Sequence, residues 1–342
     1  MLQPLWTEMA SDSTPADPAA FATSIQHLLR TEPLRIVTVR SAAAASGSPL
    51  LGLAVLRVYN NTFNVTKAHL ESIIVAADHR SRGIGTQLVN ETKKLAAAAG
   101  AREIVSYPST QQFEATRFFF NQRMTITDMY FNGSCTTKVD RSNGSNPANS
   151  PQSPMSPLSP SVAALAAAAA PFVATCIDPC NPSVSDLALL RAGENVHRQL
   201  RMKMPQGTEA YLARMKVIGA DGAKVVVVAE RNPAGAGAAA DAASAVVSAS
   251  PVALGVGVYR FYVDSVTRRL KCFVDDLITD SGRRSLGVGA ALVDAIRADA
   301  RSRGVESFQL DSGVHRHQAH KFYFREGMVI DRFSFGGPLE LV

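Results

Sequence analysis

The stretch that decides the fold occurs twice, as IIVAADHRSRGIGTQLV at residues 73–89 and as LITDSGRRSLGVGAALV at residues 277–293. In both copies an apolar run typical of a strand precedes a turn of pattern R-x-x-G-x-G. Apolar residues at helical spacing follow the turn. The arginines that open the two turns, Arg80 and Arg284, lie 204 residues apart. The sequence therefore predicts a strand, a glycine-bearing turn and a helix at two places in the chain.

The similarity between the two copies extends well beyond the turn. At the same offset, residues 76–131 align without a gap against residues 280–335, and GLAVLRVY at 52–59 parallels GVGVYRFY at 255–262. Each copy has a strand pair, a further strand, the turn, a helix, a strand, a short helix and a final strand. Self-similarity over such a length indicates a duplicated unit. We therefore predict a tandem pair of α/β domains, each with a mixed sheet.

Two segments differ from the rest in composition and suggest where the domains divide. Residues 141–170 are rich in Ser, Pro and Asn and then in Ala, and such a segment cannot bury enough apolar surface to fold. We predict a flexible linker there, between an abbreviated first domain at 1–140 and a second domain at 171–342. The similar residues 231–251 lie between two strand-like runs, which predicts a long loop inside the second domain.

Composition excludes several classes of protein. The chain has 342 residues, 46% of them hydrophobic, and its net charge of +6 is spread without a basic block, so no nucleic-acid partner is expected. No apolar run is long enough to span a membrane. The four cysteines are too few and too scattered for a disulfide framework. We expect a cytoplasmic protein with no membrane partner; the oligomeric state is left open.

The repeated turn has the chemistry of a phosphate cradle. Its glycines let the backbone approach an anion closely, and the N–H groups at the start of the following helix point towards it. One R-x-x-G-x-G is a weak signal. Here the motif occurs twice, each time between a strand and an amphipathic helix. The same pattern, A-x-x-F-[YF]-F-x-x-x-M, follows both copies, and this combination is a specific signal.

These motifs resemble the acetyl-CoA motif of the GNAT acetyltransferase superfamily, whose pattern is a strand, [RQ]-x-x-G-x-[GA] and a helix. The resemblance implies acetyl-CoA as co-substrate, with its pantetheine arm along the strand and its pyrophosphate on the turn. Leu286 departs slightly from the pattern, because many members have a basic or small residue there. The implied acetyl-CoA contacts are Leu277, Ile278, Thr279, Arg284, Ser285, Leu286, Gly287, Val288, Gly289 and Ala290 in the second repeat, and Ile73, Ile74, Val75, Arg80, Arg82, Gly83, Ile84 and Gly85 in the first.

The same resemblance implies direct transfer of an acetyl group to a primary amine. The departing thiolate needs a proton, which the family often takes from a tyrosine, and Tyr323 matches that position. The first repeat has Phe119 there, which has no proton to give, and Arg123 where the second repeat has Gly327. We therefore expect catalysis in the second repeat and a degenerate first repeat.

A carboxylate must take the proton of the attacking amine. Asp275 and Asp276 lie on the strand before the second turn, and strand alternation places only one of them at the cleft. Either is a candidate for the base or the substrate anchor. The aligned acid in the first repeat is Glu71, and catalysis there through Glu71 is one alternative function. A non-catalytic tandem acyl-CoA-binding scaffold is the other.

No metal is expected. His315, His317 and His320 are close in sequence, but no cysteine or carboxylate cluster accompanies them, so solvated histidines or substrate contacts explain them better than zinc. The expected partner is an amine acceptor, either a small molecule or a protein, with the small molecule favoured; no motif reveals its identity.

Overall fold

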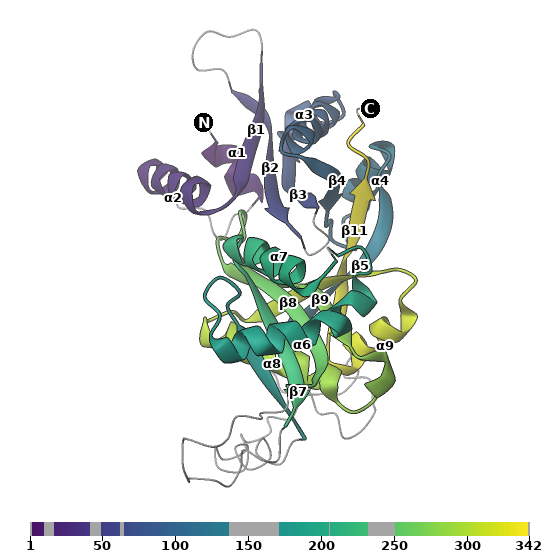
Figure 1. The fold of residues 1–342 in the computed structure, drawn as a ribbon. Coiled ribbons are helices and arrows are strands. Elements are labelled where there is room, and N and C mark those ends of the chain that lie inside the picture. The colour runs from purple at the N-terminus through teal and green to yellow at the C-terminus, as the bar shows by residue number, and fades with distance from the viewer. Residues whose placement is uncertain are drawn as a thin grey trace.

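The computed structural model describes residues 2–9, 17–41, 49–61, 65–136, 171–204, 206–231 and 250–340. The predicted linker at 141–170 and nearly all of the predicted loop at 231–251 lie outside these ranges. The described residues form a mixed sheet of eleven strands with helices packed against it (Figure 1). The first half of the chain supplies α1 (Gln3–Met9), α2 (Pro18–Thr31), β1 (Leu34–Arg40), β2 (Leu50–Asn60), β3 (Thr66–Val75), α3 (Ile84–Ala98), β4 (Ala101–Ser106), α4 (Phe113–Asn121) and β5 (Thr125–Ser134). The second half supplies β6 (Phe172–Ile177), α6 (Val184–Leu200), α7 (Thr208–Ala220), β7 (Ala223–Glu230), β8 (Ala253–Val263), β9 (Leu270–Thr279), α8 (Val288–Ser302), β10 (Ser307–Gly313), α9 (His317–Arg325) and β11 (Val329–Gly337).

The mixed α/β fold and its duplication are confirmed. The order β2, β3, turn, α3, β4, α4, β5 in the first half recurs as β8, β9, turn, α8, β10, α9, β11 in the second. The equivalent helices α3 and α8 each begin directly after a glycine in the left-handed backbone region, Gly83 at φ 81° and Gly287 at φ 85°. A residue with a side chain is disfavoured at that φ, which explains why glycine stands at both helix starts.

The last strand of each half lies in the part of the sheet built by the other half. The strand order is β1-β2-β3-β4-β11-β5-β10-β9-β8-β7-β6. β11 runs between β4 and β5, and β5 runs between β11 and β10, in antiparallel pairing throughout. In Figure 1 the yellow β11 extends upward beside the blue β4 of the first half. The chain division at 141–170 stays a prediction; in space, each half of the sheet includes a strand from the other repeat.

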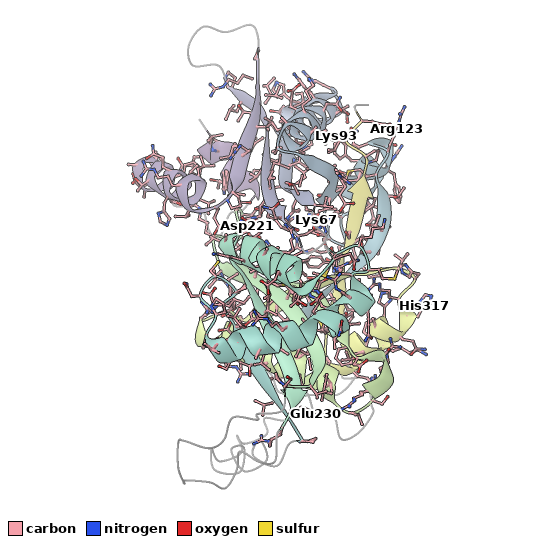
Figure 2. All side chains as sticks on the ribbon, in the orientation of Figure 1. Lys67, Lys93, Arg123, Asp221, Glu230 and His317 are labelled. Carbon is pink, nitrogen blue, oxygen red and sulfur yellow. The ribbon has the colours of Figure 1, made fainter. Side chains whose placement is uncertain are left out.

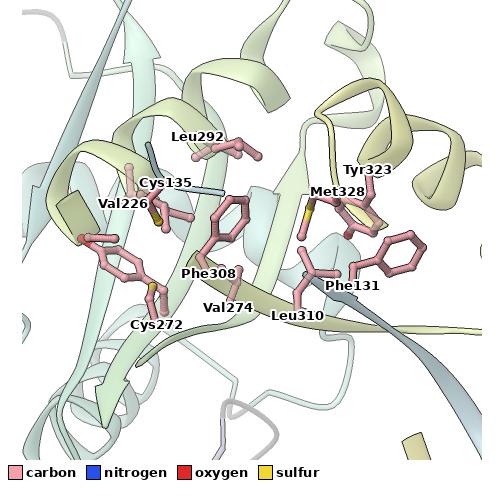
Figure 3. Close-up of a cluster of buried hydrophobic side chains, with 14 of the residues drawn as sticks. Phe131, Cys135, Val226, Cys272, Val274, Leu292, Phe308, Leu310, Tyr323 and Met328 are labelled. Carbon is pink, nitrogen blue, oxygen red and sulfur yellow. The ribbon is translucent and has the colours of Figure 1, made fainter. Parts of the chain in front are cut away.

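Apolar side chains on the exchanged strands anchor this arrangement. Phe131 of β5 is fully buried in a cluster with Leu292, Phe308 and Tyr323 of the second half (Figure 3). Reciprocally, Phe335 of β11 is fully buried among residues of α3, α4 and β4. Burial of a phenylalanine contributes roughly 1.5–3 kcal/mol, so these two side chains help to hold the exchanged strands in place.

The helices α3 and α8 each carry a buried cation. Each cation bonds the chain at or just beyond the end of the exchanged strand, β11 for α3 and β5 for α8. Lys93 of α3, labelled in Figure 2, donates to the carbonyl oxygen of Glu340 at 2.7 Å. Arg297, the aligned residue of α8, donates through Nε to the carbonyl oxygen of Ser134 at 3.2 Å, and its guanidinium also bonds the carbonyl oxygen of Glu326. These cations satisfy backbone oxygens that would otherwise be buried beside an apolar cluster.

Replacing Arg297 by Met is expected to lower the free energy of unfolding by about 3 kcal/mol, because buried backbone and carboxylate oxygens lose a charged donor. Urea denaturation measures the change. Arg303→Met at the C-cap of the same helix is the matched control: its side chain is 39% exposed and paired with Asp299, and we expect a cost below about 1 kcal/mol. Equal effects of the two substitutions would contradict the assigned role of Arg297.

The two halves also meet through a pair of equivalent arginines, Arg57 on β2 and Arg260 on β8. Each bonds a carboxylate of its own half, donates to a backbone oxygen of the other half and stacks on a tyrosine of the other half. The partners are Glu71, the Val263 oxygen at 2.7 Å and the Tyr262 ring for Arg57, and Asp275, the Asn60 oxygen at 3.1 Å and the Tyr59 ring for Arg260. The interface between the halves is therefore nearly two-fold symmetric.

Candidate active site

Two neighbouring strands separate at the point where the second glycine turn is reached. β9 and β10 are parallel and pair only from Cys272 to Val274 on β9. Beyond Val274, residues 276–279 are paired to β8 but not to β10. The side of β9 that faces β10 therefore offers backbone N–H and C=O groups to a ligand. The first half repeats the feature, since β3 pairs with β4 only up to His69.

A β-bulge interrupts β9 at Asp275. Val258 of β8 is paired with Asp276, and Tyr259 with Val274, so Asp275 is an extra residue. Glu71 is the corresponding extra residue of β3. A bulge breaks the strict alternation of side chains. This corrects the expectation that only one of Asp275 and Asp276 is at the cleft, because both residues line the cavity described below.

The second turn has the conformation of an anion cradle. Ser285 at φ 69° and Gly287 at φ 85° are both left-handed, and residues 284–287 are exposed. The backbone N–H groups before α8 are thus available to a phosphate, and the helix dipole favours one. Arg284 is exposed and has no ion-pair partner among the described residues. The turn is fixed to α6 by Gln199, which bonds both Asp280 and the N–H of Ser281.

Gly289 and Gly85 leave room for an aromatic ring that packs on the start of each helix. A Cβ at Gly289 would lie 3.1 Å from the Phe322 ring, and one at Gly85 would lie 3.0 Å from the Phe118 ring. The predicted contacts Val288 and Ala290 share the first turn of α8 with Gly289, and Leu277, Ile278 and Thr279 end β9. Leu286 is 59% exposed at the tip of the turn.

The first turn has the same backbone but a different setting. Ser81 and Gly83 are left-handed, while Ile73, Ile74 and Val75 end β3, and Ile84 and Gly85 begin α3. Arg82 is exposed, as is Arg80. However, the Arg80 guanidinium is bonded to Glu8 of α1 at 2.6 Å and to the Val75 oxygen at 3.1 Å. Arg80 is thus engaged within the protein, unlike its counterpart Arg284.

A cavity of about 260 Å³ lies beside the separated strands of the second half. Both halves of the chain line it. The first half contributes Asn61, Lys67, Glu103 and Asp128, and the second half contributes Leu200, Arg201, Phe273 to Leu277, Leu310 to Gly313, His315, Arg316 and Tyr323. Figure 2 labels Lys67, one of the residues of the first half that line the cavity.

Tyr323, the predicted proton donor, lies on α9 and lines the cavity. Its ring packs against Phe131 of the exchanged strand β5, with centroids 5.0 Å apart (Figure 3). Burial is the main cause that raises the pKa of its hydroxyl to about 12, against the opposing effect of Arg316. The phenol is therefore neutral at physiological pH and carries a proton that it can donate.

Asp276 is the centre of a buried network. Its side chain is fully buried, Oδ2 lies 2.9 Å from Nε2 of His197, and Oδ1 is ion-paired with Arg201. The other ring nitrogen of His197 lies 3.2 Å from the Tyr211 hydroxyl. Burial alone would raise the pKa of Asp276, but Arg201 and His197 outweigh it and lower that pKa. The carboxylate is therefore held ionised, and Arg201 also bonds the Asp275 carbonyl oxygen at 3.1 Å.

Asp275 and Glu71 occupy equivalent places with different surroundings. Asp275 Oδ2 accepts from Arg260 at 2.6 Å beside the cavity. Glu71 is ion-paired with Arg57 and is not among the residues that line the cavity. Burial raises the pKa of both carboxyls, and the arginine beside each opposes that rise. Phe119, the counterpart of Tyr323, is buried in an apolar cluster with Phe335.

Several cavity residues escaped the sequence analysis. Lys67, Glu103 and Asp128 belong to the repeat that was expected to be degenerate. Arg201, directly after α6, also lines the cavity, and α6 has no aligned counterpart in the first repeat. A search of the alignment for charged residues that differ between the repeats would have pointed to Asp128, which aligns with Arg332.

Metal-ligating side chains do not gather in the part of the chain that the structure describes. His317 is exposed on α9, where Figure 2 labels it, and His315 lines the cavity. The His320 ring packs against Phe131 with centroids 5.3 Å apart.

An open mixed sheet with a glycine turn at the end of a separated strand defines a class of acyl-group transferases. The model of the acetyltransferase (GNAT) family matches residues 2–123 and 221–328. The chain belongs to the GNAT acetyltransferase family, in a tandem arrangement. Membership supports acyl transfer as the general chemistry. No curated protein matches the sequence significantly.

Solved structures share the fold at low sequence identity. A tandem GNAT protein from the clavulanic acid biosynthesis pathway matches with a TM-score of 0.50 and 12% identity, over 98% of this chain and 94% of that one. A glucosamine N-acetyltransferase region of a fungal multi-domain β-N-acetylglucosaminidase matches with a TM-score of 0.54 and 14% identity, over 98% of this chain and 36% of that one. At such identities the likeness shows the fold alone.

Proposed function

We propose that the chain is an acetyl-CoA-dependent N-acetyltransferase that acetylates a primary amine of a small molecule, with the reaction in the cavity of the second half. The observation that carries the proposal is the position of Tyr323 in a cavity beside a separated strand and an exposed anion-cradle turn. The four cysteines are free thiols, which fits the predicted cytoplasmic location.

The residues present fit acetyl-CoA. The backbone of Leu277, Ile278 and Thr279 would accept the pantetheine arm, and the N–H groups of residues 285–289 would hold the pyrophosphate, with Arg284 free to pair with a phosphate. When bound, acetyl-CoA supplies the acetyl group as a thioester. Tyr323 Oη then gives its proton to the departing sulfur, and its high pKa keeps that proton in place until the sulfur becomes basic.

Asp275 and Asp276 remain candidates for catalytic roles. Because each is already ion-paired, we propose that they act mainly by positioning: Asp276 fixes Arg201, which in turn holds the carbonyl of the bulged residue Asp275. Catalysis through Glu71 has less support, because Glu71 faces Arg57 and Phe119 replaces the tyrosine.

Acetyl-CoA turnover in the presence of small amines tests the proposal. We expect release of CoA with at least one of spermidine, glucosamine and tyramine, faster than hydrolysis of acetyl-CoA alone. Tetramethylammonium, which has the charge of an ammonium group but no N–H bond, is the control and should give no release. Binding of acetyl-CoA without turnover of any amine would favour the non-catalytic scaffold instead.

A further inference from the structure

The cavity is lined by five carboxylates that differ in their partners. Three of them are ion-paired within the protein: Asp275 with Arg260, Asp276 with Arg201, and Asp311 with Lys67, whose Nζ lies 3.5 Å away. Asp311 also accepts from the Tyr107 hydroxyl at 3.1 Å. These three charges are largely balanced before any substrate enters.

The other two carboxylates, Asp128 and Glu103, differ in their ion pairing. Neither has an ion-pair partner among the described residues, although both line the cavity. Asp128 is half-buried on β5, and Glu103 is exposed on β4. Asp128 and Glu103 are therefore the lining carboxylates that remain for a cationic substrate, beside the exposed cation Arg316. Both carboxylates come from the first half of the chain.

The strand exchange places Asp128 at the cavity of the second half. In the antiparallel pairing of β5 with β10, Asp128 is opposite Gly313, and Tyr130 is opposite Asp311. Asp128 and Asp311 are therefore diagonal neighbours on adjacent strands, close enough to interact. Without the exchange, β5 would not lie beside β10, and this end of the cavity would lack its unpaired carboxylate.

We propose that Asp128 is the proton acceptor for the amine substrate and that Glu103 anchors the incoming ammonium group at the cavity mouth. The inference rests on the proposed function and gives the acceptor its class: a small, polar amine that is cationic when it enters. The first repeat, which has Phe119 in place of the tyrosine, then contributes to catalysis directly, because it supplies the base for the reaction in the second half.

The step balances with groups already present. The ammonium gives one proton to the Asp128 carboxylate, and the neutral nitrogen attacks the thioester carbon. The C–N bond forms, the C–S bond breaks with its electron pair on sulfur, and Tyr323 Oη protonates the sulfur. The remaining surplus N–H proton leaves to solvent. Tyr323 regains a proton from solvent, and Asp128 releases its own there.

The surroundings of Asp128 suit a base. Burial raises its pKa, and the negative charges of Asp311 and Glu103 act in the same direction. The Thr127 hydroxyl and Lys67 oppose the rise. A carboxylate with a raised pKa takes a proton from an ammonium more readily than an ordinary one. Activity should fall as the pH drops through this raised pKa, because the protonated carboxyl cannot accept.

Four variants of the full chain test the assignment: Asp128→Asn, Asp128→Glu, Glu103→Gln and the exposed control Glu114→Gln on α4. Steady-state CoA release is measured with acetyl-CoA and with spermidine, glucosamine and tyramine as amine probes. Asp128→Asn should lower kcat/KM for the amine by roughly 10²–10³-fold. Asp128→Glu should restore part of the loss. Glu103→Gln should raise the KM for the amine with little change in kcat, and Glu114→Gln should resemble wild type.

The pH profile separates a base from a structural residue. In Asp128→Asn, activity should recover as the pH approaches about 10, where a free amine loses its own proton. Activity of Asp128→Asn within threefold of wild type at every pH would overturn the proposal. So would a loss without recovery at high pH, accompanied by loss of acetyl-CoA binding.

Failure of the proposed function itself is distinguishable. If wild type turns over none of the three amines, their binding is measured by calorimetric titration in the presence of CoA. Weaker binding to Asp128→Asn than to Glu114→Gln would support the ammonium contact. Equal binding, or no binding to wild type, would overturn it.

Discussion

Replacement of Tyr323 by Phe is expected to lower kcat by roughly 10²–10⁴-fold, the usual contribution of a positioned general acid, while leaving the affinity for acetyl-CoA unchanged. The substitution removes only the hydroxyl. The ring keeps its contact with Phe131 at 5.0 Å, so the apolar cluster around the exchanged strand persists. Turnover of the best amine probe gives kcat, and titration of acetyl-CoA gives the affinity.

Tyr130→Phe is the matched control for this experiment. It removes another buried hydroxyl, which donates to Gln309 Oε1 at 2.8 Å, from a tyrosine that is not among the residues lining the cavity. Any general effect of losing a buried hydrogen bond should appear in both variants. If kcat for Tyr323→Phe stays within threefold of that for Tyr130→Phe, the thiolate takes its proton from another source.

Replacement of Gly287 by Glu should raise the Kd for acetyl-CoA at least 100-fold, which corresponds to about 2.7 kcal/mol. Glutamate is disfavoured at a φ of 85°, and its carboxylate would stand where the backbone N–H groups are expected to meet a pyrophosphate. Gly83→Glu makes the same change in the first turn. Calorimetric titration of acetyl-CoA reports both the affinity and the number of sites.

The chain offers a matched control for each of these substitutions. Gly304, beyond the other end of α8, has a φ of 74° and open space where a Cβ would lie; Gly100, beyond α3, has a φ of 81° and similar space. Glutamate at either position imposes the same backbone strain far from the turn. Loss of binding in Gly83→Glu alone would reverse the assignment of the two halves and make Glu71 the base to test.

The sequence was sufficient to predict the α/β fold and its duplication. The offset of 204 residues located both turns, and the contrast between Tyr323 and Phe119 distinguished the repeats. These features are local, because each depends on a few consecutive residues whose spacing determines a helix start or a side-chain position. The structure places every predicted turn residue on the expected strand end, turn or helix start.

The exchange of β5 and β11 could not be predicted in the same way. Phe131 and Phe335 are aligned and identical, so each final strand carries the apolar pattern that either half of the sheet requires. Periodicity tells which face of a strand is buried but not which neighbour it takes. Asp128 lies on the exchanged strand β5, so its place in the cavity depends on that choice and could not be predicted.

The strand exchange also sets the order in which the chain can fold during synthesis. β4 and β5 emerge from the ribosome early, yet the slot between them is filled only when β11 has been made. Until then two strand edges in the first half remain open, and pairing across such a large sequence separation is slow. A nascent chain in this state can pair with the final strand of a neighbouring copy instead of its own. Synthesis at high local concentration should therefore favour domain-swapped oligomers.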